Sequence, residues 1–369
     1  MAVKASRRGF LAGALAASLV PRLTWADAGG PAMLGAARDA GGNYGLFGLS
    51  EQGDVTFRID LPARGHAAAA HPLRPEAVAF ARRPGTFAMV LDCVSGAVLS
   101  RLEAPEGHHF MGHGVFVADG DVLLTTENNF AERKGVIGLW DRRRDYARIG
   151  SHDVGGIGPH DVQQLSDGRL VVAVGGIFTH PDAGEGREKL NLDTMQPSLT
   201  YLDADFAISE VVALDQSLHH NSIRHLAVAD DDTVGFAMQW EGDESAAPPL
   251  LGLHGAGGMR LAEVPLQEEG RMHNYAGSIA FSGDGQAIAI TSPKGGRVQA
   301  FDRTGRFLRS FQRSDICGLA PMGRGWIGSD GFGTLVALDP EGAGAGMSLV
   351  GRADGLAWDN HLVPLPRLV

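Results

Sequence analysis

The sequence predicts an all-β fold, a seven-bladed β-propeller. Three observations predict it: a repeated sequence motif, the spacing of its copies and the complementary ends of the chain. The motif consists of a short strand, a turn rich in aspartate and glycine, and a second strand of β-branched residues; its clearest copy spans residues 158–174. Spacings of 47, 47, 65, 53, 40 and 43 residues separate the copies and are typical of one four-stranded blade per repeat. The seven copies begin at His66, His113, His160, His225, Ser278, Gly318 and His361.

The two ends of the chain complement each other in this register. Residues 33–38, 44–50 and 55–61 read as three strands that lack a leading inner strand, whereas the segment at His361 reads as an inner strand without successors. Joining the C-terminal innermost strand to the N-terminal strands completes the seventh blade and closes the ring without an open edge. We therefore expect a single propeller domain over residues 29–369.

The first residues predict an export signal. Arg7 and Arg8 stand directly before Gly-Phe-Leu, and an apolar run too short to span a membrane extends to Val20. We interpret residues 1–26 as a twin-arginine signal peptide, with an ordinary secretory signal or a membrane anchor as alternatives. The expected protein is a periplasmic monomer that is exported in the folded state and does not insert into the membrane.

The charge balance excludes some classes of partner. Without residues 1–26 the chain keeps 28 basic and 43 acidic residues, a net charge of −15 with neutral histidines. Such a surface repels nucleic acid and anionic lipid, and it favours cations. We therefore expect no nucleic-acid partner.

Five of the seven repeats open with histidine, which predicts a ring of imidazoles. Inner strands of a propeller line its channel, so their first residues should converge at its mouth although they are distant in sequence. Insertions at residues 176–198 and 240–249 are expected on the same face. Serine and glycine serve at the other two repeats, so blade packing does not require imidazole. We predict a metal site formed by His66, His113, His160, His225 and His361.

The type of ligand limits which metal ions the predicted site can bind. Imidazole suits iron, copper, zinc and nickel, whereas calcium prefers oxygen, and a structural zinc site would need local cysteine or histidine pairs. Met111 and Cys317 would add soft ligands for copper, and Glu127 and Asp193 on rim loops would add carboxylates for iron. Met111 could instead simply fill space. The predicted cofactor is a transition metal, iron or copper.

The two cysteines are not expected to form a disulfide. The repeat register places Cys93 near the outer edge of a blade and Cys317 beside the channel. These positions are farther apart than the ~4.4–6.8 Å between Cα atoms that a disulfide allows. We therefore predict two free thiols.

Several motifs together resemble a known group of proteins. They are the paired arginines, the histidine-led repeats, Gly158-Pro159-His160-Asp161, residues 191–199 and Trp358-Asp359-Asn360-His361. The chain resembles an uncharacterised family of exported bacterial seven-bladed propellers whose genes often lie beside those of imelysin-type iron-uptake proteins. The resemblance covers the mature chain and implies a periplasmic role linked to iron or copper, with imelysin-type proteins as partners. More distantly, the Gly-Pro-His and Ser-Asp-Gly-Arg motifs are similar to lactonase-type propellers, but the arginine usual before that histidine is missing.

Three functions from different classes remain open at this point. The first is a metal-binding protein that takes up, transfers or oxidises iron or copper. The second is a lactonase-like hydrolase with an acid–base pair at the channel mouth, and the third is a metal-free scaffold that binds partners on its rim. The sequence leaves open whether the protein is an enzyme.

Overall fold

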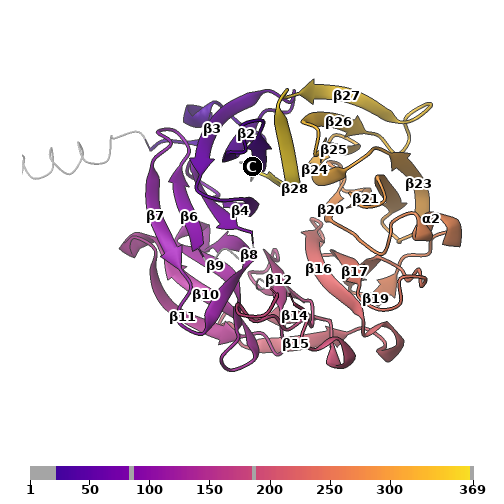
Figure 1. Ribbon diagram of the computed structural model, residues 1–369, viewed down its shortest axis with the longest axis horizontal. Helices are drawn as coiled ribbons and strands as arrows, with labels where there is room; N and C mark the ends of the chain where they lie inside the picture. The colour runs from indigo at the N-terminus through magenta and orange to yellow at the C-terminus, as the bar shows by residue number, and fades with distance from the viewer. Residues whose placement is uncertain (1–21, 83–86, 185–187, 366–369) are drawn as a thin grey trace, which may run out of the picture.

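The computed structural model describes residues 22–82, 87–184 and 188–365, so residues 1–21 of the predicted signal peptide lie outside the described part. Within it, 28 strands form seven four-stranded antiparallel sheets arranged as blades around a central axis (Figure 1). The predicted seven-bladed β-propeller is confirmed.

The first four blades follow the chain from its N-terminal side. The ring-closing blade consists of β28 (Leu356–Pro364), β1 (Met33–Asp39), β2 (Tyr44–Leu49) and β3 (Val55–Leu61). The next consists of β4 (Gly65–Ala70), β5 (Glu76–Ala81), β6 (Phe87–Asp92) and β7 (Val98–Glu103). It is followed by β8 (His108–Val117), β9 (Val122–Asn129), β10 (Lys134–Asp141) and β11 (Ala147–Asp153). The fourth consists of β12 (Pro159–Gln164), β13 (Leu170–Val174), β14 (Ser198–Leu202) and β15 (Ile208–Ala213).

Three further blades complete the ring. They are β16 (Asn221–Val228), β17 (Val234–Trp240), β18 (Leu251–Gly255) and β19 (Gly258–Leu261); then β20 (Ser278–Phe281), β21 (Ala287–Ser292), β22 (Arg297–Asp302) and β23 (Phe307–Gln312); and last β24 (Ile316–Met322), β25 (Gly325–Asp330), β26 (Thr334–Leu338) and β27 (Met347–Arg352).

The described helices are short and lie in the connections. They are η1 (Trp25–Ala28), η2 (Ala118–Gly120), η3 (Arg142–Arg144), η5 (Leu192–Thr194), η6 (Gln216–Leu218) and α2 (Leu266–Gly270). Across the described residues, none of the helices has the length and apolar character needed to span a bilayer.

Ring closure follows the predicted pattern. β28 pairs with β1 in antiparallel register from Pro364 opposite Met33 to Leu356 opposite Asp39, so a C-terminal strand is innermost in an N-terminal blade. Each inner strand contacts the inner strands of the two neighbouring blades, from β4 and β8 round to β24, β28 and back to β4. The first strand of every repeat therefore lines the central channel.

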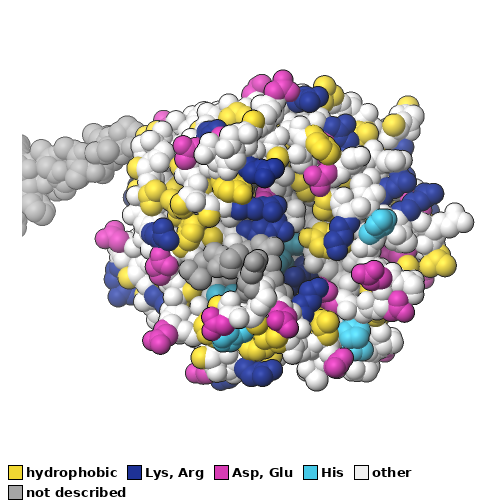
Figure 2. Space-filling model, viewed as in Figure 1, with side chains coloured by type: hydrophobic (Ala, Val, Ile, Leu, Met, Phe, Trp, Pro, Cys, Tyr) yellow, Lys and Arg dark blue, Asp and Glu magenta, His cyan; other side chains and the backbone are white. Residues whose placement is uncertain are grey.

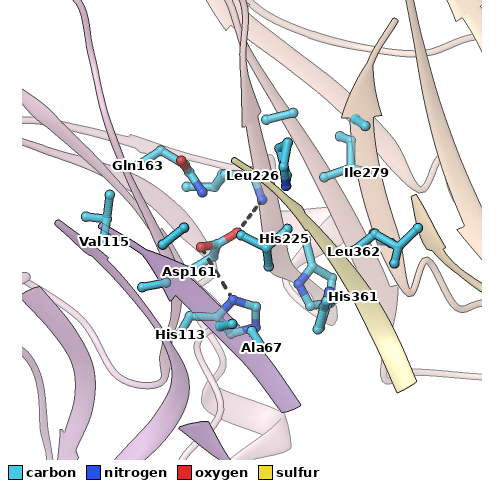
Figure 3. A pocket seen from close by; sticks show the side chains of 18 of the residues that line it. Ala67, His113, Val115, Asp161, Gln163, His225, Leu226, Ile279, His361 and Leu362 are labelled. Carbon is cyan, nitrogen blue, oxygen red and sulfur yellow. Dashed lines mark hydrogen bonds and ion pairs between the residues drawn. The ribbon is translucent and has the colours of Figure 1, made fainter. Parts of the chain in front are cut away.

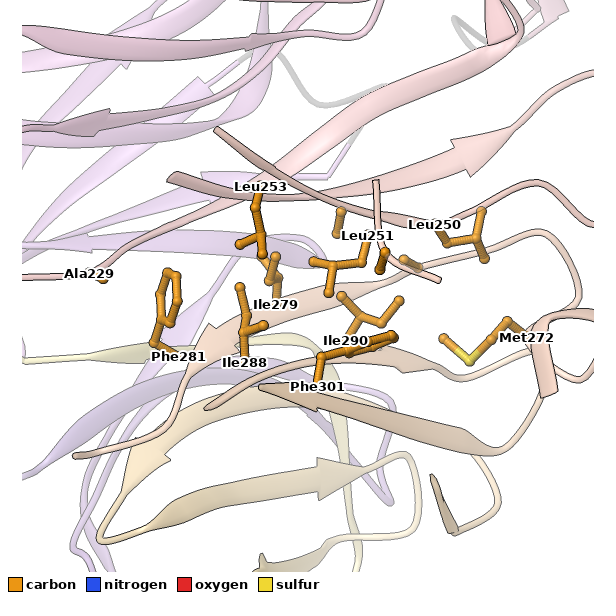
Figure 4. Close-up of a cluster of buried hydrophobic side chains, with 13 residues drawn as sticks. Ala229, Leu250, Leu251, Leu253, Met272, Ile279, Phe281, Ile288, Ile290 and Phe301 are labelled. Carbon is orange, nitrogen blue, oxygen red and sulfur yellow. The ribbon is translucent and has the colours of Figure 1, made fainter. Parts of the chain in front are cut away.

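The hydrophobic core is divided among the contacts between blades. Seven buried clusters lie at the seven blade-to-blade contacts. In the cluster of Figure 4, Leu251 and Leu253 of β18 pack against Ile288 of β21 and Phe301 of β22, with each side chain at most 1% exposed. Burying one such side chain contributes about 1.5–3 kcal/mol. These clusters fix each blade relative to the next and hence fix the inner strands around the channel.

Candidate metal centre

The five predicted histidines converge in the channel. They come from five inner strands, β4, β8, β12, β16 and β28, and eight pairs of their rings have centroids 4.6 to 5.8 Å apart. His113 is the most central, because its ring contacts those of all four others. The five rings therefore converge as predicted, but their positions are not all equivalent, because His225 lies one residue after the place in β16 that corresponds to His160 in β12.

A β-bulge accompanies the histidine in every one of these strands. The pairing register shifts between Gly65 and Ala68 in β4 and between Phe110 and Gly114 in β8. It also shifts between Pro159 and Asp161 in β12, between Ile223 and His225 in β16, and between Trp358 and Leu362 in β28, opposite Gly35 and Ala37. A bulge bends its strand and re-aims the side chain of the extra residue. In β4, β8, β12 and β28 the histidine lies inside the bulge, whereas in β16 the extra residue is Arg224 and His225 follows it.

The imidazoles are held neutral by their surroundings. Burial lowers the pKa of His66, His113, His160 and His225 well below 6.5, and it lowers the pKa of His361 to about 4. The neighbouring imidazoles and the Arg224 guanidinium add to this effect for several of them. A neutral imidazole offers a lone pair, which is the form that ligates metals.

One buried nitrogen on each ring lacks a hydrogen-bond partner among the described residues. They are Nδ1 of His66, His160 and His225, and Nε2 of His113 and His361. Ligand atoms of His66, His113 and His160 lie within 4.8 Å of one another, and so do those of His113, His225 and His361. Nitrogens that share one ion with bonds of about 2.0–2.1 Å lie about 3–4 Å apart, so small ring rotations suffice. The two groups share His113.

Asp161 and Thr126 contact the channel histidines or their strands and help to position them. The Asp161 carboxylate lies 3.6 Å from Nδ1 of His113 and accepts a hydrogen bond from the backbone N–H of Leu226 (3.0 Å) (Figure 3). It also accepts one from the backbone N–H of Val162 (2.8 Å). The hydroxyl of Thr126 shares its single hydrogen between the backbone carbonyls of His113 (3.1 Å) and His160 (3.2 Å) and so links two strands that carry histidines. Partners of this kind orient metal-binding histidines.

Two cavities in the channel are lined by these histidines. The first, here called the lower cavity, has about 360 Å³ and is lined by His113, His225, His361 and mainly small or apolar side chains of all inner strands (Figure 3). The second, here called the funnel, has about 250 Å³ and is lined by His66, His160 and His225. Around them stand Arg82, Met111, Lys189, Arg224, Gln239, Trp240, Glu241, Asn274, Tyr275, Lys294 and Asn360. Figure 2 shows Lys and Arg side chains gathered around the central hollow of one face.

Arg224 is a site residue that repeat spacing did not reveal. It is the extra residue of the β16 bulge, as His160 is of the β12 bulge, so the two hold equivalent places in their strands. The 65-residue step from His160 to His225 is one longer than the structural repeat. This one-residue excess was the only sign in the sequence that Arg224 lies at the site. It can be interpreted only when the strand pairing is known.

The four additional candidates lie in different surroundings. Met111 is buried and lines the funnel beside His66 and His160. Asp193 lies in η5 and is exposed. Cys317 is buried in β24, where its thiol is 3.4 Å from the carbonyl of Ser329. Among the described residues, neither Asp193 nor Cys317 joins the grouped ligand atoms.

The expectation that Glu127 stands on a rim loop is wrong. It lies within β9, fully buried, and accepts two hydrogen bonds from Arg148 (2.7 and 2.9 Å). His108 Nδ1 at 3.1 Å and the Thr125 hydroxyl at 2.7 Å complete its contacts. These contacts explain why its pKa is lowered despite burial. Glu127 therefore anchors β11 to β9 inside the blade.

Both cysteines are free thiols, as predicted. Cys93 is buried between the ring-closing blade and the blade of β4 to β7, whereas Cys317 lies beside the channel. Burial raises the pKa of each thiol to about 12, so neither is a ready thiolate.

Comparison with protein families places the chain. The family described as "Protein of unknown function (DUF1513)" matches residues 59–365, so the chain belongs to that family. No curated protein matches it.

Solved structures with a similar fold come from unrelated settings. Hydrazine synthase of Kuenenia stuttgartiensis matches with a TM-score of 0.60 at 13% identity, over 88% of this chain and 96% of that one. The computationally designed Ika8 protein matches with a TM-score of 0.53 at 15% identity, over 88% and 85%. A chain of the mitotic checkpoint complex matches with a TM-score of 0.53 at 10% identity, over 82% and 77%. At these identities the likeness concerns the propeller fold alone.

Proposed function

We propose that this member of the DUF1513 family is a metal-binding propeller that holds a transition-metal ion, iron or copper, among its five channel histidines. The proposal is carried by the convergence of five channel histidines, whose ligand atoms lie within 4.8 Å of one another in two overlapping groups of three, and each ring has one buried nitrogen without a hydrogen-bond partner among the described residues. Leaving a buried polar atom unpaired costs about 1–3 kcal/mol. Five such atoms in one channel are retained more readily if they bind a ligand.

A metal ion fits these nitrogens better than protons do. The pKa values of all five histidines are lowered, so protonation does not occupy the lone pairs near neutral pH. Water could satisfy the nitrogens singly, but it gives no reason for five imidazoles in a channel where Ser278 and Gly318 serve equally well for packing. An all-nitrogen set is typical of borderline metal ions such as iron and copper.

The choice between iron and copper depends on supply as well as on ligands. Copper binds nitrogen sites more tightly than iron does, so affinity measured in vitro will favour copper whatever the natural cargo is. Met111 in the funnel would add a soft ligand for copper. The periplasmic location and the imelysin-type partners, both expected from the sequence, favour iron. In this proposal the protein takes up, transfers or redox-cycles the metal outside the cytoplasm.

The decisive test combines native export with loss of two ligands. The double variant His160→Ala, His225→Ala removes one ligand from each of the two groups, and we expect at least a 100-fold loss of metal affinity, about 3 kcal/mol. Elemental analysis of protein exported naturally and never exposed to chelator measures the bound metal and its identity. His152→Ala, on the outer strand β11, is the matched control and should keep the metal. Wild-type protein that carries no transition metal and binds none at neutral pH would refute the proposal.

A second candidate, a lactonase-like hydrolase, is favoured by one observation. Burial raises the pKa of Asp161 to about 7, and its carboxyl lies 3.6 Å from His113 at the lower cavity. A carboxyl that titrates near neutral pH beside an imidazole has the properties of an acid–base pair. The test is hydrolysis of simple lactones by chelator-treated protein, with Asp161→Asn as the inactive variant. Activity that survives metal removal and disappears in this variant would favour the hydrolase, and inactivity of both proteins would eliminate it.

A further inference from the structure

The funnel above the histidines has an excess of positive charge. Four cationic side chains and one carboxylate, Glu241, line it. Arg82 is paired with Asp359 (3.0 Å), and Lys189 is paired with Glu241. Arg224 and Lys294 have no carboxylate partner among the described ion pairs, so two cations are uncompensated in a protein whose overall charge is negative.

Arg224 is the more unusual of the two. It is 8% exposed, and its Nη1 has no hydrogen-bond partner among the described residues. Its Nε donates one long hydrogen bond, 3.4 Å, to the side-chain carbonyl of Gln239. Arginine remains charged in proteins, so a buried guanidinium without an anion is costly. Its place in the β16 bulge directs it into the funnel beside His225.

Lys294 and its neighbours supply further groups at the same funnel. The Lys294 ammonium lies 4.7 Å from the centre of the Tyr275 ring, a cation–π contact that leaves its N–H donors free to turn toward a ligand. The Asn360 amide donates to the Tyr275 hydroxyl at 3.4 Å. The funnel thus combines a buried guanidinium, an ammonium and neutral polar groups, which is the chemistry that recognises oxyanions.

We propose that the funnel is an oxyanion site in which Arg224, with Lys294, binds a small carboxylate or phosphate next to the histidines. One part of the inference rests on the proposed function: a dication held by neutral imidazoles beside Arg224 places several positive charges close together. A bound oxyanion compensates them and supplies the oxygen ligand that the histidine groups lack. The metal would then pass the funnel together with an anion, because the uncompensated cations repel a bare dication.

Calorimetric titration of the metal-free full-length protein in a buffer whose only other anion is chloride tests the anion site by itself. The probes are acetate, malonate and inorganic phosphate. We expect at least one to bind, with at least a tenfold loss of affinity in Arg224→Gln and a smaller loss in Lys294→Gln. The matched control is Arg306→Gln, which removes an exposed arginine that pairs with Asp302 in an outer hairpin, and it should bind as wild type does. Binding of malonate but not phosphate identifies a carboxylate ligand, and the reverse identifies a phosphate.

Thermal unfolding separates anion binding from a merely structural role of Arg224. In chloride buffer, Arg224→Met should melt at or above the wild-type temperature, since it removes a buried cation without a partner. Added oxyanion should raise the melting temperature of wild type and leave that of the variant unchanged. The proposal is overturned if no probe binds wild type, or if Arg224→Gln binds as wild type does.

A third arm distinguishes failure of the metal proposal from failure of this one. Copper and iron titrations are repeated with and without the best-binding probe. Metal affinity that increases with the probe in wild type but not in Arg224→Gln supports the joint site. Anion binding without any metal binding would support the oxyanion site and refute the metal centre.

Discussion

Five blades place histidines in the channel, and two do not, although all seven have the same four-stranded plan. β20 pairs with β21 residue by residue, from Ser278 opposite Thr291 to Phe281 opposite Ile288, and has no bulge. β24 keeps a bulge between Ile316 and Leu319 but has glycine at position 318. The two blades therefore differ from the other five in different ways: β20 lacks the bulge, and β24 has the bulge but no side chain at position 318.

The two blades without histidine make the lower cavity possible. Ser278, Ile279, Ala280 and Phe281 of β20, with Leu319 of β24, contribute to its lining. The channel is therefore asymmetric, with histidines from five blades and smaller or apolar side chains from the other two. A symmetric ring of seven histidines would fill this space, and the asymmetry leaves room for a bound molecule beside the centre.

The pH dependence of stability should show the largest effect of the channel histidines. Between pH 6.5 and 4 the unfolded chain binds protons at these five residues, whereas the native protein resists protonation because their pKa values are lowered. The unfolded state thus binds more protons, so stability rises with pH in this window, by up to about 1.4 kcal/mol per pH unit for each histidine. We expect several kcal/mol of stability to be lost from pH 6.5 to 4.

Two buried carboxyls act in the opposite direction. The pKa values of Asp161 and Glu269 are raised to about 7, so they stabilise the native state at low pH and lose that contribution as the pH rises toward 7. Five histidines outweigh two carboxyls, which gives a net rise up to about pH 6.5. Denaturant unfolding of metal-free protein at pH 4.5, 5.5 and 6.5 measures the slope. The slope should be shallower in His160→Ala, His225→Ala, and an unchanged slope would contradict the assigned pKa shifts.

Gly318→Ala tests whether the β24 bulge has room for a side chain. A Cβ there would lie 2.5 Å from Oγ of Ser329 and 2.9 Å from the backbone nitrogen of Leu362. Overpacking of this kind costs about 1–3 kcal/mol. Gly150→Ala in β11, where a Cβ meets no atom within 4 Å, should change stability by less than about 0.5 kcal/mol. Equal melting temperatures for the two variants would show that the β24 bulge can accommodate a side chain.

Thr126→Val should have the smallest effect on stability. Together with Thr291→Val, it compares the blades that carry histidines with those that do not. It removes the hydroxyl that donates to the carbonyls of His113 and His160, at a cost of about 1–2 kcal/mol, and it should also weaken metal binding. Thr291→Val removes a similar hydrogen bond to the carbonyl of Cys317 (2.7 Å) in a blade without a channel histidine. That variant should lose similar stability and keep its metal affinity. Thr126→Ser should restore both properties, as titration and denaturant unfolding will measure.

The sequence predicted the blades well because repeat spacing and ring closure are properties of the chain order. It predicted the convergence of His66 and His361 for the same reason, although almost 300 residues separate them. It did not reveal Arg224, because a bulge moves the register by one residue without changing the visible pattern. It misplaced Glu127 because β9 continues to Asn129, so that Glu127 lies within the strand, where Arg148 pairs with it from another strand of the same blade.

The strand β28, which closes the ring of blades, also contains His361 of the proposed metal centre. His361 reaches the other imidazoles only when Leu356–Pro364 has paired with β1, although the other four histidines precede it by more than 130 residues. In the proposed metal centre the complete set of ligands would thus form only when the ring closes, and loading would follow that step. An ion bound to both His113 and His361 would link β28 to β8. We therefore expect loading to slow unfolding, since opening the ring would then require the ion to leave.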